Sequence, residues 1–259
     1  MFGSIGRAFT EHGDRASDLA AIADRIARSL LEIDVPGIAG VEIGVRAAPA
    51  RIVGGDYLDV IVRPEEPGAF TFAIGDASGK SLPAALKAMM LKYLVRGLVR
   101  VLGADLASIV RRTNEVVCED IEPDSYITLA IGTLSADRRT ASFAVAGHDP
   151  ALVWRHATRT IDELPPGGIL LGFNPQARYA VQSAPIEPGD VIVLYTDGFT
   201  EAKSPDGEQF TLARVKDGIA RYAGCTAQEL ADALFEEVEA YGNRTRSDDT
   251  TIVVVRVVD

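Results

Sequence analysis

The sequence is poor in the residues that build zinc sites and disulfide frameworks. Its 259 residues include three histidines and two cysteines, and the cysteines, Cys118 and Cys225, lie far apart. No His/Cys cluster has the spacing of a zinc site, so we expect two reduced thiols in a cytoplasmic protein. The sequence also lacks a run of ~18 apolar residues and the apolar core of a signal peptide. We therefore predict no transmembrane helix.

Basic residues are also scarce relative to acidic ones. There are 26 Lys and Arg against 37 Asp and Glu, which gives a net charge of −11 and a pI near 4.8. An acidic surface argues against binding to nucleic acid or to anionic membrane, because both attract Lys/Arg patches. With 47% hydrophobic residues, the chain can bury one large core or two small ones.

Aspartates stand at the ends of several apolar runs. Asp76 and Asp197 each end a predicted buried strand, Asp56 follows two glycines, and the pair Asp248-Asp249 precedes another strand. Each aspartate taken singly is more simply a turn or helix-cap residue. Acids that meet in one cleft repel one another unless hard divalent cations neutralise them. The set as a whole therefore predicts a two-metal hydrolase.

The apolar patterns predict strands, long helices and a hairpin. The strands are expected at residues 41–47, 57–63, 70–75, 126–134, 141–146, 151–155, 179–183, 191–195 and 250–258. Two adjacent helices, 81–102 and 105–120, separate the third and fourth strands, and a capping box at Thr226 and Glu229 opens a helix that ends near Tyr241. Adjacent helices among consecutive strands fit antiparallel sheets with helices outside, not a parallel sheet.

The N-terminal part predicts a separate helix. Ser17 is a candidate cap, and one apolar stripe follows it: Leu19, Ile22, Ile26 and Leu30. An isolated helix of this length is marginal, so the stripe either packs on its own domain or joins two protomers as a homodimer. We expect residues 1–38 to form a helical linker or regulatory segment and residues 39–259 to form the catalytic domain.

The segment 75–81 (GDASGKS) is similar to a phosphate-binding loop. Its glycines are closer together than that motif requires, and Asp76 would repel a phosphate. A nucleotide hydrolase that uses Gly75 to Ser81 is therefore the weaker alternative.

Taken in order, several segments resemble the metal-dependent Ser/Thr protein phosphatases of the type-2C (PPM) superfamily, and most closely the bacterial SpoIIE-like branch. The matching segments are 49–59 (PARIVGGDYLD), 75–80 (GDASGK), 83–86 (PAAL), 146–150 (AGHDP), 188–202 (PGDVIVLYTDGFTEA) and 248–251 (DDTT). The resemblance runs from about residue 20 to the end. It implies an α+β fold, a four-layer α-β-β-α sandwich of two antiparallel sheets flanked by helices.

The resemblance also implies a metal centre and a reaction. It carries over Asp56, Asp76, Asp197 and Asp248 as ligands, with the Ala77 carbonyl as a further oxygen and Asp249 ranked below Asp248. Two divalent cations, Mn²⁺ or Mg²⁺, would share a bridging hydroxide that attacks phosphoserine or phosphothreonine. The substrate would be a phosphorylated regulatory protein, an anti-sigma-factor antagonist. A catalytically silent binding module of the same fold is the alternative.

Some positions depart from the family pattern. Asp149 stands where Asn is usual, Ser81 where Gly is frequent, and Leu58 where an aromatic is common. None of these removes an implied ligand, but they leave substrate preference open. Relatives often carry sensor or receiver domains upstream, and none is recognisable here, so we expect that this route of control is missing or is supplied by a separate regulatory protein.

Other polar residues near these motifs each have two possible roles. His148 is either a general acid or a hydrogen-bonded loop anchor, and we favour the anchor. Lys80 contacts phosphate or pairs with a carboxylate. Glu201 orients a water or is solvated surface. Arg244 and Arg246 hold a phosphopeptide or form an exposed basic turn.

Overall fold

The computed structural model describes residues 21–22, 25–122 and 124–258. The predicted cap Ser17 and the stripe residue Leu19 lie outside the described residues. No described helix is long and apolar enough to cross a membrane.

Two five-stranded sheets form the centre of the molecule, and every strand pair in them is antiparallel. The first sheet has the order β1 (Val41–Ala48), β10 (Thr250–Val257), β9 (Val191–Tyr195), β6 (Ala151–Arg155) and β7 (Thr160–Leu164). The second has the order β2 (Asp56–Val62), β3 (Phe70–Ala77), β4 (Ile127–Leu134), β5 (Thr140–Ala146) and β8 (Val181–Pro185).

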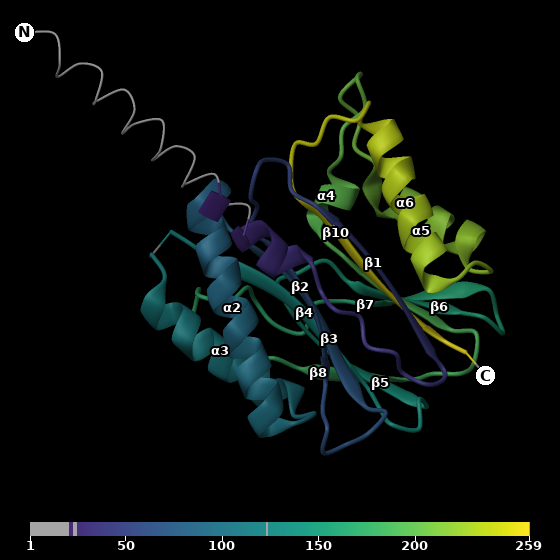
Figure 1. Ribbon diagram of the computed structural model, residues 1–259, viewed down its shortest axis with the longest axis horizontal. Coiled ribbons are helices and arrows are strands. Elements are labelled where there is room, and N and C mark those ends of the chain that lie inside the picture. The colour runs from purple at the N-terminus through teal and green to yellow at the C-terminus, as the bar shows by residue number, and fades with distance from the viewer. Residues whose placement is uncertain (1–20, 23–24, 123, 259) are drawn as a thin grey trace, which may run out of the picture.

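Helices cover the outer face of each sheet (Figure 1). The helices α2 (Ser81–Leu102) and α3 (Leu106–Asp120) pack on the second sheet, and α5 (Thr211–Tyr222) and α6 (Ala227–Tyr241) pack on the first. A single turn, α4 (Asp197–Thr200), follows β9. This confirms the predicted four-layer sandwich. The sequence analysis did not identify β7, α4 or α5.

Strand alternation assigns each side chain to one of three apolar layers. In β3, Phe70, Phe72 and Ile74 lie between the two sheets, whereas Ala73 and Ala77 face the helices α2 and α3. The same period places Asp76 on the face between the sheets, because it follows Ile74 by two positions. Asp56 precedes the inter-sheet residue Leu58 by two positions and faces the same way. Both acids therefore lie at the rim of the central layer.

The end of the N-terminal helix packs on α2. Residues 25–31 are helical, Leu30 is 1% exposed in the layer under α2, and Ile26 packs against that layer. The Lys92 ammonium donates a hydrogen bond to the Ser29 carbonyl near the C-terminal end of this helix. Ile22 remains 49% exposed. The domain boundary at residue 38 stays a prediction.

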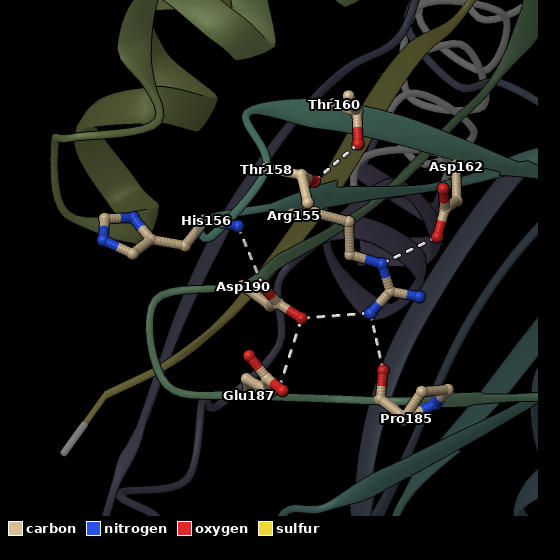
Figure 2. A network of polar contacts seen from close by, with 8 residues as sticks. All are labelled: Arg155, His156, Thr158, Thr160, Asp162, Pro185, Glu187 and Asp190. Carbon is tan, nitrogen blue, oxygen red and sulfur yellow. Dashed lines mark hydrogen bonds and ion pairs between the residues drawn. The ribbon is translucent and has the colours of Figure 1, made fainter.

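A polar network around the buried Asp190 joins β6 and β7 to the turn before β9 (Figure 2). The Arg155 guanidinium donates to Asp162 Oδ2 at 2.7 Å, to the Pro185 carbonyl at 2.5 Å and to Asp190 Oδ2 at 3.0 Å. The other oxygen of Asp190 accepts from the His156 backbone N–H at 2.9 Å. Every oxygen of the buried Asp190 side chain is thus satisfied, which fixes this turn.

Candidate metal centre

Asp56 and Asp76 face each other across neighbouring strands. The β2–β3 register places them directly opposite, on the same face of the sheet. Like charges in this position repel. Burial, and then the Asp76 charge, raise the pKa of Asp56 well above its ordinary value.

Two threonines of the opposite sheet hold Asp56 in place. The Thr251 hydroxyl donates to Asp56 Oδ2 at 2.6 Å and the Thr196 hydroxyl donates to the same oxygen at 2.9 Å. These bonds oppose the rise in the pKa of Asp56, because they favour the charged carboxylate. They also connect the two sheets at the rim of the central layer.

Asp197 and Asp248 approach from the first sheet. Asp197 begins α4 directly after β9, and Asp248 lies just before β10. Burial, followed by the charges of Asp197, Asp248 and Asp249, raises the pKa of Asp76 to about 7. Burial and then the charge of Asp248 raise the pKa of Asp197 to about 6. Acids that are distant in the sequence therefore act on one another, and their role as metal ligands stays a prediction.

Asp249 is already engaged by the backbone. Its Oδ1 accepts from the Ala50 N–H at 2.8 Å and its Oδ2 accepts from the Gly55 N–H at 2.6 Å. Asp249 therefore fixes the loop that leads into Asp56. Its role as a metal ligand stays a prediction.

Two glycines allow the ligand loops to approach one another. A Cβ on Gly55 would lie 2.4 Å from the Ala77 carbonyl oxygen, and a Cβ on Gly198 would lie 1.9 Å from the Asp249 carbonyl oxygen. Any side chain would displace these loops. The close approach also brings the Ala77 carbonyl, a predicted ligand, to the loop before Asp56.

His148 has the geometry of a loop anchor. Its Nδ1 is 2.8 Å from the Thr128 hydroxyl on β4, and its Nε2 is 3.1 Å from the Tyr195 carbonyl on β9. Both ring nitrogens are thus engaged between the two sheets. Burial lowers the pKa of His148 to about 4, so the ring is neutral near pH 7 and Nε2–H donates to the carbonyl.

A cavity of about 310 Å³, here called the acid cavity, opens beside these carboxylates. Its lining includes Asp76, Asp197, Asp149, Tyr126 and Leu170. Asp149 Oδ2 is buried there without a hydrogen-bond partner among the described residues. Burial and then the charge of Glu201 raise the pKa of Asp149. The sequence analysis treated Asp149 only as a departure from the family pattern, although its position next to His148 was a usable signal.

The donor set fits hard divalent cations. It consists of carboxylate oxygens and the Ala77 carbonyl, and it includes the orphaned oxygen of Asp149, which lacks a proton donor and suits a cation. In the part of the chain that the structure describes, no group of three or more His, Cys, Asp or Glu side chains is placed so that it could hold a metal ion. The carboxylates therefore lie in one region of the molecule but do not form a preassembled metal site.

The phosphate-binding-loop interpretation does not fit the fold. Asp76 lies inside β3, and β3 pairs antiparallel with both of its neighbours. A nucleotide-binding loop of that type follows a strand of a parallel βαβ unit.

The two arginines before Asp248 pair with acids of α6: Arg244 with Glu236 at 3.4 Å, and Arg246 with Glu239 at 2.6 Å.

Comparison with known proteins agrees with this geometry. The SiaA-PP2C domain of Pseudomonas aeruginosa has the same fold, with a TM-score of 0.76 at 20% identity, covering 98% of this chain and 99% of that one. The catalytic domain of the serine threonine protein phosphatase PstP, solved in complex with two manganese ions, has a TM-score of 0.62 at 16% identity and covers 85% of this chain and 99% of that one. These two likenesses show that the chain has the fold of the PP2C-type phosphatase domains.

Sequence comparison identifies the family within this class. The family model for Stage II sporulation protein E (SpoIIE) matches residues 66–258. The phosphoserine phosphatase RsbU of Bacillus subtilis is 28% identical over 237 residues, which cover 91% of this chain and 69% of RsbU. Two other curated relatives are covered to 40% and 24% of their length. The chain belongs to the SpoIIE family of Ser/Thr phosphatases.

Proposed function

We propose that this protein hydrolyses phosphoserine or phosphothreonine on a regulatory protein in a reaction that requires Mn²⁺ or Mg²⁺. The convergence of Asp56, Asp76, Asp197 and Asp248 at one rim of the sandwich carries this proposal. Two divalent cations would be held by these carboxylates and the Ala77 carbonyl. When bound, they lower the pKa of a water and neutralise charge on the phosphoryl oxygens.

The chain's own residues prepare the site for that chemistry. Thr196 and Thr251 fix the Asp56 carboxylate by two hydrogen bonds, and Asp249 fixes the loop that precedes it. His148 holds the wall of the acid cavity between the two sheets and offers no free ring nitrogen for proton transfer. The acid cavity gives a phosphorylated side chain a path to the carboxylates.

The substrate class follows from the relatives. RsbU, described as a phosphoserine phosphatase, aligns with 91% of this chain, and this supports phosphoserine hydrolysis. That the substrate is an anti-sigma-factor antagonist is the further part of the proposal and rests on the SpoIIE-like resemblance. A separate regulatory protein, a homodimer through the N-terminal helix and a cytoplasmic location belong to the same proposal.

The activity is tested with purified protein, Mn²⁺ and a phosphoserine protein. We expect phosphate release that stops in excess chelator and is lost in Asp76→Asn. Asp217→Asn, on the exposed face of α5, removes the same charge outside the site and should keep full activity. Full activity in chelator would refute the proposal, and the absence of Mn²⁺ binding by calorimetry would favour the silent binding module.

The substrate is identified by trapping. An Asp197→Asn variant with impaired hydrolysis is used to retain phosphoproteins, which mass spectrometry then names. The proposal requires that the wild-type protein dephosphorylate a retained regulator in the presence of Mn²⁺. A retained protein that the wild type leaves phosphorylated is not the substrate.

A further inference from the structure

A second cavity, of about 140 Å³, borders the carboxylates on a different side. We call it the basic cavity because Arg51, Lys80 and Arg246 line it. Asp248 also lines it, and the charge of Asp248 acts on both Asp76 and Asp197. The two cavities therefore flank one cluster of acids, and they differ in chemistry. The acid cavity has Tyr126 and Leu170 in its wall, whereas the basic cavity has three cations beside the carboxylates of Asp248 and Asp249.

The three cations of the basic cavity are not equivalent. Arg246 is neutralised by Glu239, with hydrogen bonds of 2.6 and 3.1 Å, and lies 5.6 Å from the Phe235 ring centre. Arg51 and Lys80 are exposed, and neither side chain has a hydrogen bond or ion pair to any residue within the described ranges. In a protein with a net charge of −11, two uncompensated cations beside a catalytic cluster form a local attraction for anions.

The backbone holds these two cations in place. Arg51 follows Ala50, whose N–H is bound by Asp249 Oδ1. Lys80 lies between Gly79, with φ +107°, and Ser81, with φ +61°, in a turn that leads into α2. Both side chains thus extend from fixed loops on either side of the cavity, so little backbone ordering is needed for them to bind a ligand together.

We propose that the basic cavity is a specificity subsite for an anionic group next to the phosphoserine of the substrate. This inference rests on the proposed phosphatase function. A phosphoserine that entered the acid cavity would bring a neighbouring residue of the substrate toward the basic cavity, because Asp248 of the same acid cluster lines it. A carboxylate or a second phosphate there gains charge-assisted hydrogen bonds from Arg51 and Lys80.

The test compares three phosphoserine peptides with the full-length protein and Mn²⁺. Two residues before or after the phosphoserine they carry Asp, a second phosphoserine, or Asn. We expect kcat/KM to favour the anionic peptides over the Asn peptide by roughly fivefold to tenfold, the range of an exposed to partly desolvated charge pair. The Asp and phosphoserine peptides show which anion the subsite prefers.

Variants assign this preference to the cavity. Arg51→Gln and Lys80→Gln should each reduce the ratio of anionic to neutral kcat/KM, and the double variant should bring it to about one. The matched control is Arg100→Gln, because Arg100 is an exposed cation in the last turn of α2, remote from the turn that carries Lys80. It lowers the net charge equally and should leave the ratio unchanged. Circular dichroism verifies that each variant is folded.

The outcomes separate the subsite from the activity. Equal loss of rate on all three peptides in Arg51→Gln would mean that the cations serve the reacting phosphate, and would overturn the subsite. If Arg100→Gln lowered the ratio of anionic to neutral kcat/KM as much, the preference would be a general effect of protein charge, and this would also overturn the subsite. Wild-type hydrolysis without any preference refutes the subsite alone, whereas no hydrolysis of any peptide refutes the proposed function.

Discussion

At the scale of single residues, the carboxylates of the site are buried and repel one another. Burial and mutual repulsion raise the pKa of Asp56, Asp76 and Asp197. Carboxylates in ordinary structural roles are paired, as Asp190 and Asp59 are with Arg155 and Arg96. Asp56, Asp76 and Asp197 have no cationic partner among the residues that the structure describes, and a bound divalent cation would neutralise their charge.

The raised pKa of Asp76 gives a pH-dependent prediction. Its folded-state pKa of about 7 exceeds the ordinary value of 3.8, so the folded metal-free protein retains a proton that the unfolded chain releases. This contribution to stability is complete below the unfolded pKa and is lost as the pH rises through about 7. We expect metal-free Asp76→Asn to exceed the wild type in stability at pH 8 by on the order of 1 kcal/mol, and to match it near pH 4.

Urea denaturation in chelator at both pH values measures this difference. Addition of Mn²⁺ should then stabilise the wild type more than Asp76→Asn, because the variant lacks a ligand. If the free energies of unfolding of the two proteins changed in parallel with pH, this would contradict the raised pKa of Asp76.

The Arg155 network gives a residue-scale prediction on stability alone. Arg155→Met leaves the buried Asp190 without its cation and should destabilise the fold by roughly 2–3 kcal/mol. Asp162 is 51% exposed, so Asp162→Asn should cost less than about 1 kcal/mol. Both variants should keep Mn²⁺-dependent activity in the folded state, as measured below the melting temperature. An Arg155→Met protein as stable as the wild type would argue against the network's role.

At the scale of elements, local sequence signals were sufficient for most strands and for the long helices. The predicted helix at residues 81–102 has those bounds in the structure, and the capping box of α6 is present with both of its hydrogen bonds. The strand β7 was missed because it is an exposed edge strand, with polar residues that give no apolar alternation. The helix α5 buries Val215 and Ile219, a stripe that the sequence does carry and the analysis overlooked.

The start of α2 offers an element-scale prediction. Ser81 has φ +61°, in the left-handed region that favours glycine. Ser81→Gly should therefore raise stability by about 0.5–1 kcal/mol, because it relieves the steric cost of the Cβ. Ser108→Gly in the first turn of α3, where φ is not positive, should lower it. Thermal denaturation of the two variants compares them, and destabilisation by Ser81→Gly would show that the serine side chain matters more than the strain.

At the scale of the whole molecule, the two sheets work as one body because the central layer joins them. Thr196 and Thr251 of the first sheet bind Asp56 of the second, and His148 spans both at the same rim. The acids can therefore meet only when the sandwich is assembled. Loss of packing anywhere in the central layer should weaken metal affinity as well as stability.

The N-terminal helix is tested by deletion of residues 1–34. Because Leu30 is 1% exposed under α2, we expect a loss of about 2–4 kcal/mol in stability. If Ile22, which is 49% exposed, contributes to a contact between protomers, the number of protomers per particle, measured by light scattering, also falls. Leu30→Ala separates the two effects, since it should reduce stability without changing the mass. An unchanged number of protomers per particle after the deletion would refute the homodimer.

The sequence by itself determined the type of most elements and the position of the acids at or near strand ends, because both follow from local periodicity and turn residues. Only the tertiary structure decided that Asp56 lies opposite Asp76, that Asp249 binds the loop before Asp56 and that Arg51 and Lys80 line one cavity. The bond from Thr251 to Asp56 spans 195 residues of sequence. Such contacts arise when two apolar sheet faces pack together, and no local pattern specifies which strand ends that packing brings together.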